Sequence, residues 1–173
     1  CLQDWCHLKW EKYFLLFLIY SSIGFILEVI QSIFTSKKIK NRGFLIGPII
    51  PIYGVGGIAM TLLLGRFIEK PLLLFFMSSI IFSILEYFTG YVLEKIFKLR
   101  WWDYSNRKYN INGRICLEFM IPMSVLGCIV MYVLNPIFMG FINSLNPLLL
   151  NVIFYTTATF FLCDVYLSFT TIY

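Results

Sequence analysis

The sequence predicts an all-α protein, a membrane bundle of about five transmembrane helices. Of its 173 residues, 60% are hydrophobic and only 13% are charged, and the mean hydropathy is +0.81. A soluble domain of this size carries far more charge on its surface. A membrane-spanning helix needs about 20 mostly apolar residues. Five stretches meet this requirement: residues 13–34, 44–65, 71–97, 115–141 and 148–173.

These spans use most of the chain, so a single transmembrane domain over residues 1–173 is expected. The first span is expected to be a retained helix, because it is long and lacks the small-residue cleavage site of a signal peptide. The spans also lack the alternating pattern of about ten residues that is typical of outer-membrane barrels.

The positive charge is concentrated in the loops after the first and third spans. With five spans, these loops share a side of the membrane with the C-terminus and hold ten of the 14 Lys and Arg residues. Because basic loops tend to stay in the cytoplasm, Lys38 and Arg107 are predicted to lie inside, and Glu69 and the N-terminus outside. The basic excess therefore indicates topology, and no nucleic-acid partner is expected.

Two similar segments predict a parallel repeat of two helix hairpins, residues 13–67 and 71–141. Each segment has Ile-Leu-Glu in its first span, a basic loop with Asn, Arg and Gly, and then Ile-Pro. Ten positions separate Asn41 from Pro51 and Asn112 from Pro122. Transporters often contain parallel repeats, so we expect the hairpins to be related by a rotation of about 180° around the membrane normal. Residues 148–173 would add a helix outside the repeat.

Carboxylates in the spans are the first candidates for a site, because a charge costs roughly 2.5–3.5 kcal/mol at the bilayer centre. Glu28 and Glu86 occupy equivalent positions in the repeat. One interpretation is a paired site for a cation, a proton or an amine. The other is two structural ion pairs, with Arg42 and Arg114 as the partners.

Asp164 has no equivalent in the repeat. Asn151 and Thr159 lie in the same span, so these three residues predict a hydrogen-bonded polar stripe along the last helix.

Arg42 and Arg114 each follow an Asn at the entrance to a span that an Ile-Pro pair soon interrupts. The amides at the start of a helix favour an anion, and a guanidinium adds a planar fork of donors. Both side chains are therefore predicted to turn inward, toward Glu28, Glu86, Glu118 or Asp103.

Glycine and proline are concentrated at the entrance to the second span, in residues 43–57. Proline removes a backbone donor, so the helix is predicted to be broken or kinked here. The freed backbone groups would line a polar cavity. Alternatively, the glycines only allow tight helix packing. The segment is no nucleotide-binding loop, because it lacks the Lys-Ser/Thr pair.

The loop after the third span begins with Trp101-Trp102-Asp103-Tyr104-Ser105. Trp and Tyr favour the headgroup layer of a membrane, which explains the aromatic residues as an interfacial belt. The accompanying Asp, Asn and Arg residues make the loop a candidate for binding a phosphate or a polar headgroup.

Catalytic and metal-binding signatures are scarce. The chain has neither HExxH nor GxSxG, and its one histidine, His7, lies beside Cys1 and Cys6, one ligand short of a metal site. No metal and no other cofactor is expected, and a function other than catalysis is favoured.

Several unusual motifs occur in order along the chain. They read Asn41-Arg42-Gly43-Phe44-Leu45-x-Gly47-Pro48-x-x-Pro51-Ile52-Tyr53-Gly54, Glu86-Tyr87-x-Thr89-Gly90, Trp101-Trp102-Asp103-Tyr104-Ser105 and Asn112-Gly113-Arg114-Ile115-Cys116-Leu117. In these motifs, over residues 20–127, the chain resembles the bacterial membrane proteins labelled "Putative ABC-transporter type IV", or CmpB-like. It departs from the family near Ser124, where the family usually has a glycine.

The resemblance implies a multi-pass protein of the bacterial cytoplasmic membrane. It also implies a separate ATPase subunit, because the chain has no ATPase domain of its own. Membrane lipids and a second copy of the chain are the other expected partners.

The first functional hypothesis is therefore a small transporter component, either a permease or a membrane-embedded substrate-binding subunit. Its candidate binding residues are Glu28, Arg42, Tyr53, Glu86, Trp102, Asp103, Arg114 and Glu118. The alternative is a membrane-embedded enzyme or binding protein that acts on phosphate-bearing lipid headgroups through Arg42, Trp102, Asp103 and Arg114. A non-catalytic scaffold or sensor is the third hypothesis.

Overall fold

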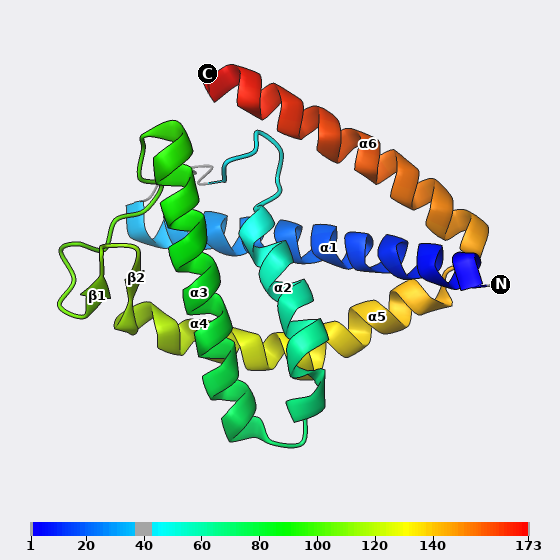
Figure 1. The fold of residues 1–173 in the computed structure, drawn as a ribbon, viewed down its shortest axis with the longest axis horizontal. Helices are drawn as coiled ribbons and strands as arrows, with labels where there is room; N and C mark the ends of the chain where they lie inside the picture. Colours follow the sequence, from blue (N-terminus) through cyan, green and yellow to red (C-terminus); the bar gives the residue numbers. More distant parts are fainter. Residues whose placement is uncertain (1, 37–42, 173) are drawn as a thin grey trace. The chain divides into compact units, whose positions relative to one another are not determined.

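The computed structural model describes residues 2–36 and 43–172, with the side chains of residues 10–34 and 43–171 (Figure 1). Predictions about the side chains of Cys1, Cys6, His7, Lys38 and Arg42 therefore fall outside the described residues. The helices are α1 (Leu2–Ser36), α2 (Pro51–Leu64), α3 (Pro71–Phe97), α4 (Leu117–Ile129), α5 (Asn135–Ser144) and α6 (Pro147–Ile172). A short hairpin of β1 (Asn110–Ile111) and β2 (Ile115–Cys116) lies between α3 and α4.

The all-α class and the multi-pass membrane architecture are confirmed. The helices long and apolar enough to cross a membrane are Trp10–Phe34, Pro71–Phe97, Leu117–Ser144 and Pro147–Thr171. The second predicted span differs, because its helical part begins only at Pro51 and runs as a shorter apolar helix to Phe67. Gly47 and Ile50 each precede a proline, and that position disfavours helical backbone. The predicted break at the entrance to this span is thus confirmed.

The span from Leu117 to Ser144 is also irregular, but not at the predicted Ile-Pro pair: α4 runs through Pro122 without a break. Between α4 and α5 lies one π-helical turn, Val130–Leu134, in which the Asn135 N–H donates to the Val130 carbonyl. Pro136 follows directly and has no N–H to donate, so a local change in helix type lets the chain pass the proline.

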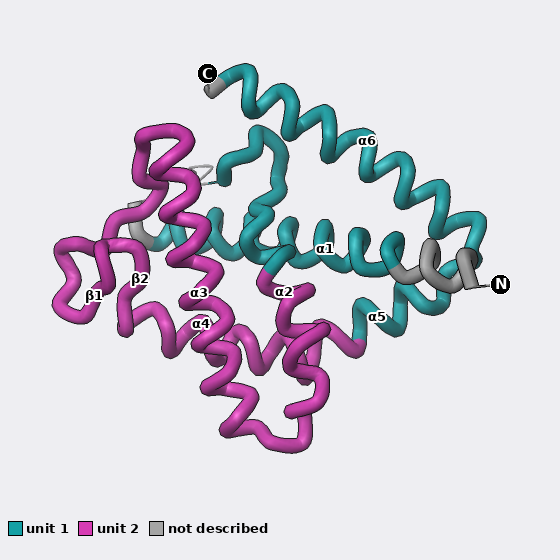
Figure 2. The backbone as a smooth tube through the Cα atoms, viewed as in Figure 1, with its two compact units in different colours: residues 1–55, 137–173 teal, residues 56–136 magenta. Residues whose placement is uncertain are grey.

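The chain divides into two compact units (Figure 2). In the first, residues 1–55 and 137–173, aromatic rings join α1 to α6: Phe14 meets Phe154 edge to face at 5.2 Å, and Phe17 meets Phe161 at 5.6 Å. Each such pair stabilises the folded state by about 0.5–1.5 kcal/mol, in addition to the effect of burying apolar surface. The buried Leu16 of α1 extends this core.

The second unit, residues 56–136, has an aliphatic core formed by Met60, Leu64, Leu74 and Met131. Here α4 approaches α3 closely, because Gly127 lies against Ser78: an added Cβ would be 2.6 Å from the Ser78 Cβ. Small residues allow such approach between membrane helices. The rotation that would relate the two hairpins of the predicted repeat stays a prediction.

Two of the three residues in the polar stripe predicted on α6 form hydrogen bonds to residues outside α6. With its nitrogen turned toward Glu11 of α1, the Asn151 amide donates to Glu11 Oε2 at 2.8 Å. Asp164 accepts from the backbone N–H of Gly47. Thr159, in contrast, donates to the Tyr155 carbonyl of its own helix. The stripe therefore fastens α6 to other parts of its unit at two separate points.

Candidate functional site

Glu28 of α1 and Tyr53 of α2 form the first polar pair. The Tyr53 hydroxyl donates to Glu28 Oε1 at 2.9 Å. Gly24, one helical turn before Glu28, makes room for the tyrosine ring, since a Cβ on Gly24 would be only 2.6 Å from the Tyr53 Cβ. Two of the residues predicted for the site are thus in direct contact.

The backbone that leads into α2 is held by hydrogen bonds to α1 and α6. Ile50 N–H donates to the Ser21 carbonyl of α1 at 3.1 Å. On the other side, Ile46 N–H donates to Ser168 Oγ at 2.9 Å and Gly47 N–H donates to Asp164 Oδ1 at 3.1 Å. These bonds satisfy amides that a non-helical segment leaves without helical partners.

Glu86 of α3 forms a similar pair in the other unit. The Tyr104 hydroxyl donates to Glu86 Oε1 at 3.0 Å, and the Tyr104 ring stacks on Phe119 with centroids 4.9 Å apart. The tyrosine comes from the loop before α4, not from the position that corresponds to Tyr53. That position is Ser124, whose hydroxyl donates to the Met120 carbonyl of its own helix.

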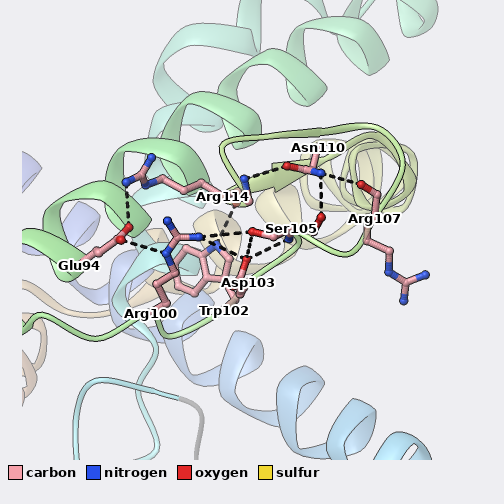
Figure 3. Close-up of polar contacts among 9 residues, drawn as sticks. Glu94, Arg100, Trp102, Asp103, Ser105, Arg107, Asn110 and Arg114 are labelled. Carbon is pink, nitrogen blue, oxygen red and sulfur yellow. Dashed lines mark hydrogen bonds and ion pairs between the residues drawn. The ribbon is translucent and has the colours of Figure 1, made fainter.

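The loop between α3 and α4, residues 98–116, folds into a compact hairpin (Figure 3). Its turn has positive φ at both Asn112 (53°) and Gly113 (68°), and Arg114 N–H donates to the Ile111 carbonyl at 3.0 Å. Asn-Gly is the preferred sequence for such a turn, because both residues tolerate positive φ. The turn brings Arg114 back to α3.

Arg114 turns inward as predicted, with its side chain only 16% exposed, but its ion-pair partner is Glu94 and not one of the four predicted carboxylates. Arg114 Nη2 lies 2.8 Å from Glu94 Oε2. The guanidinium also lies over the rings of Tyr87 and Tyr91, 5.4 Å from each centroid. The hairpin returns beside the last turns of α3, which carry Glu94.

Glu94 also joins a second arginine to the hairpin. Arg100 Nε donates to Glu94 Oε1 at 2.9 Å, and this bond raises the pKa of Arg100 further above its ordinary value. Asp103 accepts from the Ser105 hydroxyl and from the Ser105 N–H, which together with Arg100 hold the pKa of Asp103 below its ordinary range. One carboxylate of α3 therefore binds both ends of the loop.

Trp102 and Arg107, two further polar residues of the loop, have different surroundings. Trp102 Nε1–H donates to the Arg114 carbonyl at 2.9 Å, and its ring packs over Gly90 of α3. Arg107 pairs with the predicted site residue Glu118 at 3.0 Å, with both side chains more than half exposed. The donors and acceptors of Trp102, Asp103 and Arg114 thus serve mainly to fold the loop (Figure 3).

Sequence reasoning missed Glu94 as the centre of this loop, and it missed the link between Asp164 and Gly47. The Asn112-Gly113 pair, a strong hairpin signal, would have shown that Arg114 folds back onto α3. Asp164 and Gly47 are 117 positions apart in sequence, and no local pattern indicates their contact. Among the described residues, no three His, Cys, Asp or Glu side chains gather in a group that could hold a metal ion.

A family model described as "Putative ABC-transporter type IV" matches residues 15–169. The chain belongs to this family. The match to the Putative ABC-transporter type IV family extends beyond the sequence motifs and includes Asp164 and Ser168 of α6 as well as both carboxylate–tyrosine pairs. Neither the curated proteins nor the solved structures contain a match to the chain.

Proposed function

We propose that the protein is the membrane-embedded subunit of a transporter in the bacterial cytoplasmic membrane, driven by a separate ATP-hydrolysing subunit. The family description supports the transport role. The structural observation that carries the proposal is the broken second span, with the Glu28–Tyr53 pair beside the break.

The length of the apolar helix that follows the break, α2 with the short 3-10 turn Gly65–Phe67, explains why the break matters. The apolar helix Pro51–Phe67 has 17 residues. At 1.5 Å per residue it is about 25 Å long, less than the roughly 30 Å of a hydrocarbon core. A second span that crosses a hydrocarbon core of this thickness includes part of the irregular segment 43–50. Irregular backbone is tolerated at that depth only where protein covers it or where it lines a polar cavity, and transporters place substrate and ion sites at such broken helices.

The chemistry of the pairs supports a positively charged or protonatable substrate group. In each pair a tyrosine hydroxyl donates to a glutamate oxygen and fixes the direction of the carboxylate. An oriented carboxylate in a membrane attracts a cation, an amine or a proton. We assign Glu28 and Tyr53 as one substrate-binding pair, and Glu86 and Tyr104 as its counterpart.

The headgroup hypothesis receives less support from the same geometry. Trp102 Nε1, the Asp103 carboxylate and Arg114 Nη2 bond to Arg114, Ser105, Arg100 and Glu94, within the loop and α3, and of these groups only Arg114 Nε is buried without a partner among the described residues. A phosphate would have to displace these contacts. A scaffold or sensor role makes no use of the two carboxylate–tyrosine pairs.

The proposal can be tested on the protein purified from its native membranes and reconstituted in nanodiscs. The expected result is a complex that hydrolyses ATP, with hydrolysis reduced at least several-fold by Glu28→Gln and by Glu86→Gln. Glu69→Gln, a change in an exposed carboxylate outside the helices, is the matched control and should leave hydrolysis intact. A purified wild-type protein without ATP hydrolysis, or glutamine variants as active as wild type, would contradict the transporter role.

A further inference from the structure

The second half of α6 contacts the irregular segment 43–50 at three positions. Gly47 N–H donates to Asp164, 3.1 Å from Oδ1 and 3.2 Å from Oδ2. Ile46 N–H donates to Ser168 Oγ at 2.9 Å, and the rings of Phe44 and Phe169 meet edge to face at 5.0 Å. Positions 164 and 168 are four residues apart and therefore share one face of the helix.

The segment needs these contacts because its amides have no helical acceptors. Pro48 and Pro51 have no N–H at all, and an amide without a partner costs several kcal/mol in a membrane. Ile49 N–H donates to the Gly47 carbonyl and Ile50 N–H to Ser21 of α1. The amides of Ile46 and Gly47 find their acceptors on α6, in the Ser168 hydroxyl and the Asp164 carboxyl group.

Gly47 fits this arrangement because it has no side chain. A Cβ at this position would lie 2.7 Å from Asp164 Oδ2. The carboxylate therefore approaches the backbone more closely than it would at any other residue type. The Asp164–Gly47 contact fixes the segment at a point six residues before Tyr53.

Between Gly47 and the Glu28–Tyr53 pair, the backbone is held at three positions. Ile50 is bonded to α1, Tyr53 N–H donates to the Ile50 carbonyl at 3.2 Å, and Gly54 packs against Phe17, with an added Cβ only 2.6 Å from its carbonyl oxygen. A shift of the segment at Gly47 would therefore be passed on to the tyrosine that meets Glu28.

We propose that Asp164 is a positioning residue: it holds the segment 43–50 on α6 so that Tyr53 reaches Glu28. Its importance for transport rests on the proposed function, whereas its effect on the Glu28–Tyr53 bond does not. Ser168 acts in the same way through Ile46, and α6 becomes part of the site through the segment 43–50.

A double-mutant cycle tests the positioning role on the full chain in detergent. In wild type, Tyr53→Phe removes the bond to Glu28 and should lower the apparent Tm by roughly 2–4 °C. In an Asp164→Ala background, Tyr53→Phe should lower the apparent Tm much less, because the Tyr53–Glu28 bond is already weakened. An equal loss of Tm in both backgrounds would overturn the proposal.

Thr159→Ala is the matched control background, because its hydroxyl bonds only within α6. In this background Tyr53→Phe should lower the apparent Tm by the same amount as in wild type. A smaller decrease would mean that any substitution in α6 weakens the Glu28–Tyr53 bond, and would contradict a specific role for Asp164. If Asp164→Ala does not fold, Asp164→Asn and Ser168→Ala serve in the same cycle with a smaller reduction expected. If the Tm losses of Tyr53→Phe and of each α6 variant simply added, in both Asp164→Asn and Ser168→Ala, the positioning role would again be contradicted.

The ATP hydrolysis of the reconstituted complex separates this inference from the proposed function. Coupling between Asp164 and Tyr53, together with reduced hydrolysis in Asp164→Ala, supports both. Coupling with unchanged hydrolysis supports the positioning role and argues against Glu28–Tyr53 as the transport site. Absence of coupling overturns the positioning role, whatever the hydrolysis measurements show.

Discussion

In the hairpin of α1 and α2, the tyrosine that meets the glutamate comes from the second helix itself. In the hairpin of α3 and α4, Tyr104 comes from the loop that precedes the second helix. The connecting segments differ accordingly. The anchors of segment 43–50 include Asp164 and Ser168, more than 100 positions away, whereas those of the loop 98–116 come from the loop itself and from the adjoining helices, Glu86 and Glu94 of α3 and Glu118 of α4.

This difference changes the interpretation of the sequence motifs. The loop with the denser set of polar and aromatic residues uses them to fold itself, so its unusual composition indicates local structure before ligand binding. The sparser segment depends on α6, a helix outside the predicted repeat. Residues 148–173 are thus more than an addition to two hairpins, because they complete the first one.

The membrane topology of the two connecting segments gives the test with the largest expected effect, because a site is labelled either from outside or not at all. Both connecting loops should lie in the cytoplasm, as the distribution of basic residues predicts. Single cysteines at Lys38, Arg107 and Glu69, in a cysteine-free background, can be tested with an impermeant thiol reagent on intact cells. Only the Glu69 site should react from outside. Labelling of the Arg107 site from outside would place the two loops differently and end the comparison.

Glycine substitutions should show the next largest effect, and they should differ between the hairpins. At Gly54 an added Cβ lies 2.6 Å from the Phe17 carbonyl oxygen, a backbone atom that cannot rotate away. At Gly127 it meets the Ser78 Cβ and the flexible end of Met60. Both alanine variants overpack a helix contact, which costs about 1–3 kcal/mol, and Gly54→Ala should be the more damaging.

Unfolding of the purified variants in detergent measures this difference. Gly140→Ala is the control, because no atom of the described residues lies within 4 Å of a Cβ there and alanine favours a helix. It should be neutral or slightly stabilising. Equal losses at Gly54 and Gly140 would mean that the close approach of α1 and α2 is unimportant.

Arginine-to-lysine changes test the second loop. Arg114→Lys keeps the charge but loses the planar fork on Glu94 and the stacking on Tyr87 and Tyr91. We expect Arg114→Lys to lower the free energy of unfolding by roughly 1–2 kcal/mol. Arg107→Lys, in an exposed ion pair with Glu118, should cost less than about 0.5 kcal/mol.

The same change at Arg42 extends this test to the first hairpin. Both Arg42→Lys and Arg114→Lys should impair ATP hydrolysis while the protein still inserts. If both match wild type in stability and hydrolysis, the two arginines are topological anchors only.

Local patterns in the sequence predicted much of the fold, because hydrophobic length and proline position act within a few residues. The apolar spans, the break before Pro51 and the inward turn of Arg114 all follow from such patterns. The identity of the ion-pair partner of Arg114 was not predicted, because it depends on the direction in which the Asn112-Gly113 turn returns the chain to α3. The Asp164–Gly47 contact depends on the packing of α6 and has no local signal at all.

Acidification should give the smallest effect and should act on the second loop through Asp103. The pKa of Asp103 is lowered in the folded loop, first by the Ser105 hydroxyl, then by the Ser105 N–H and Arg100. A lowered pKa means that Asp103 stabilises the fold above the ordinary aspartate range, and that this contribution is lost as the pH falls through the lowered value. Hydrogen-exchange protection of residues 100–114 should therefore decrease below about pH 4.

Asp103→Asn is the matched variant for this measurement, because it keeps an acceptor for Ser105 and does not titrate. Its loop should show a weaker dependence of protection on pH, with somewhat lower protection at neutral pH. Protection of α5, which contains no Asp or Glu, provides the internal reference. If the two segments lost protection in parallel in both proteins, acid would be acting on the whole fold and not on the bonds that Asp103 makes inside its loop.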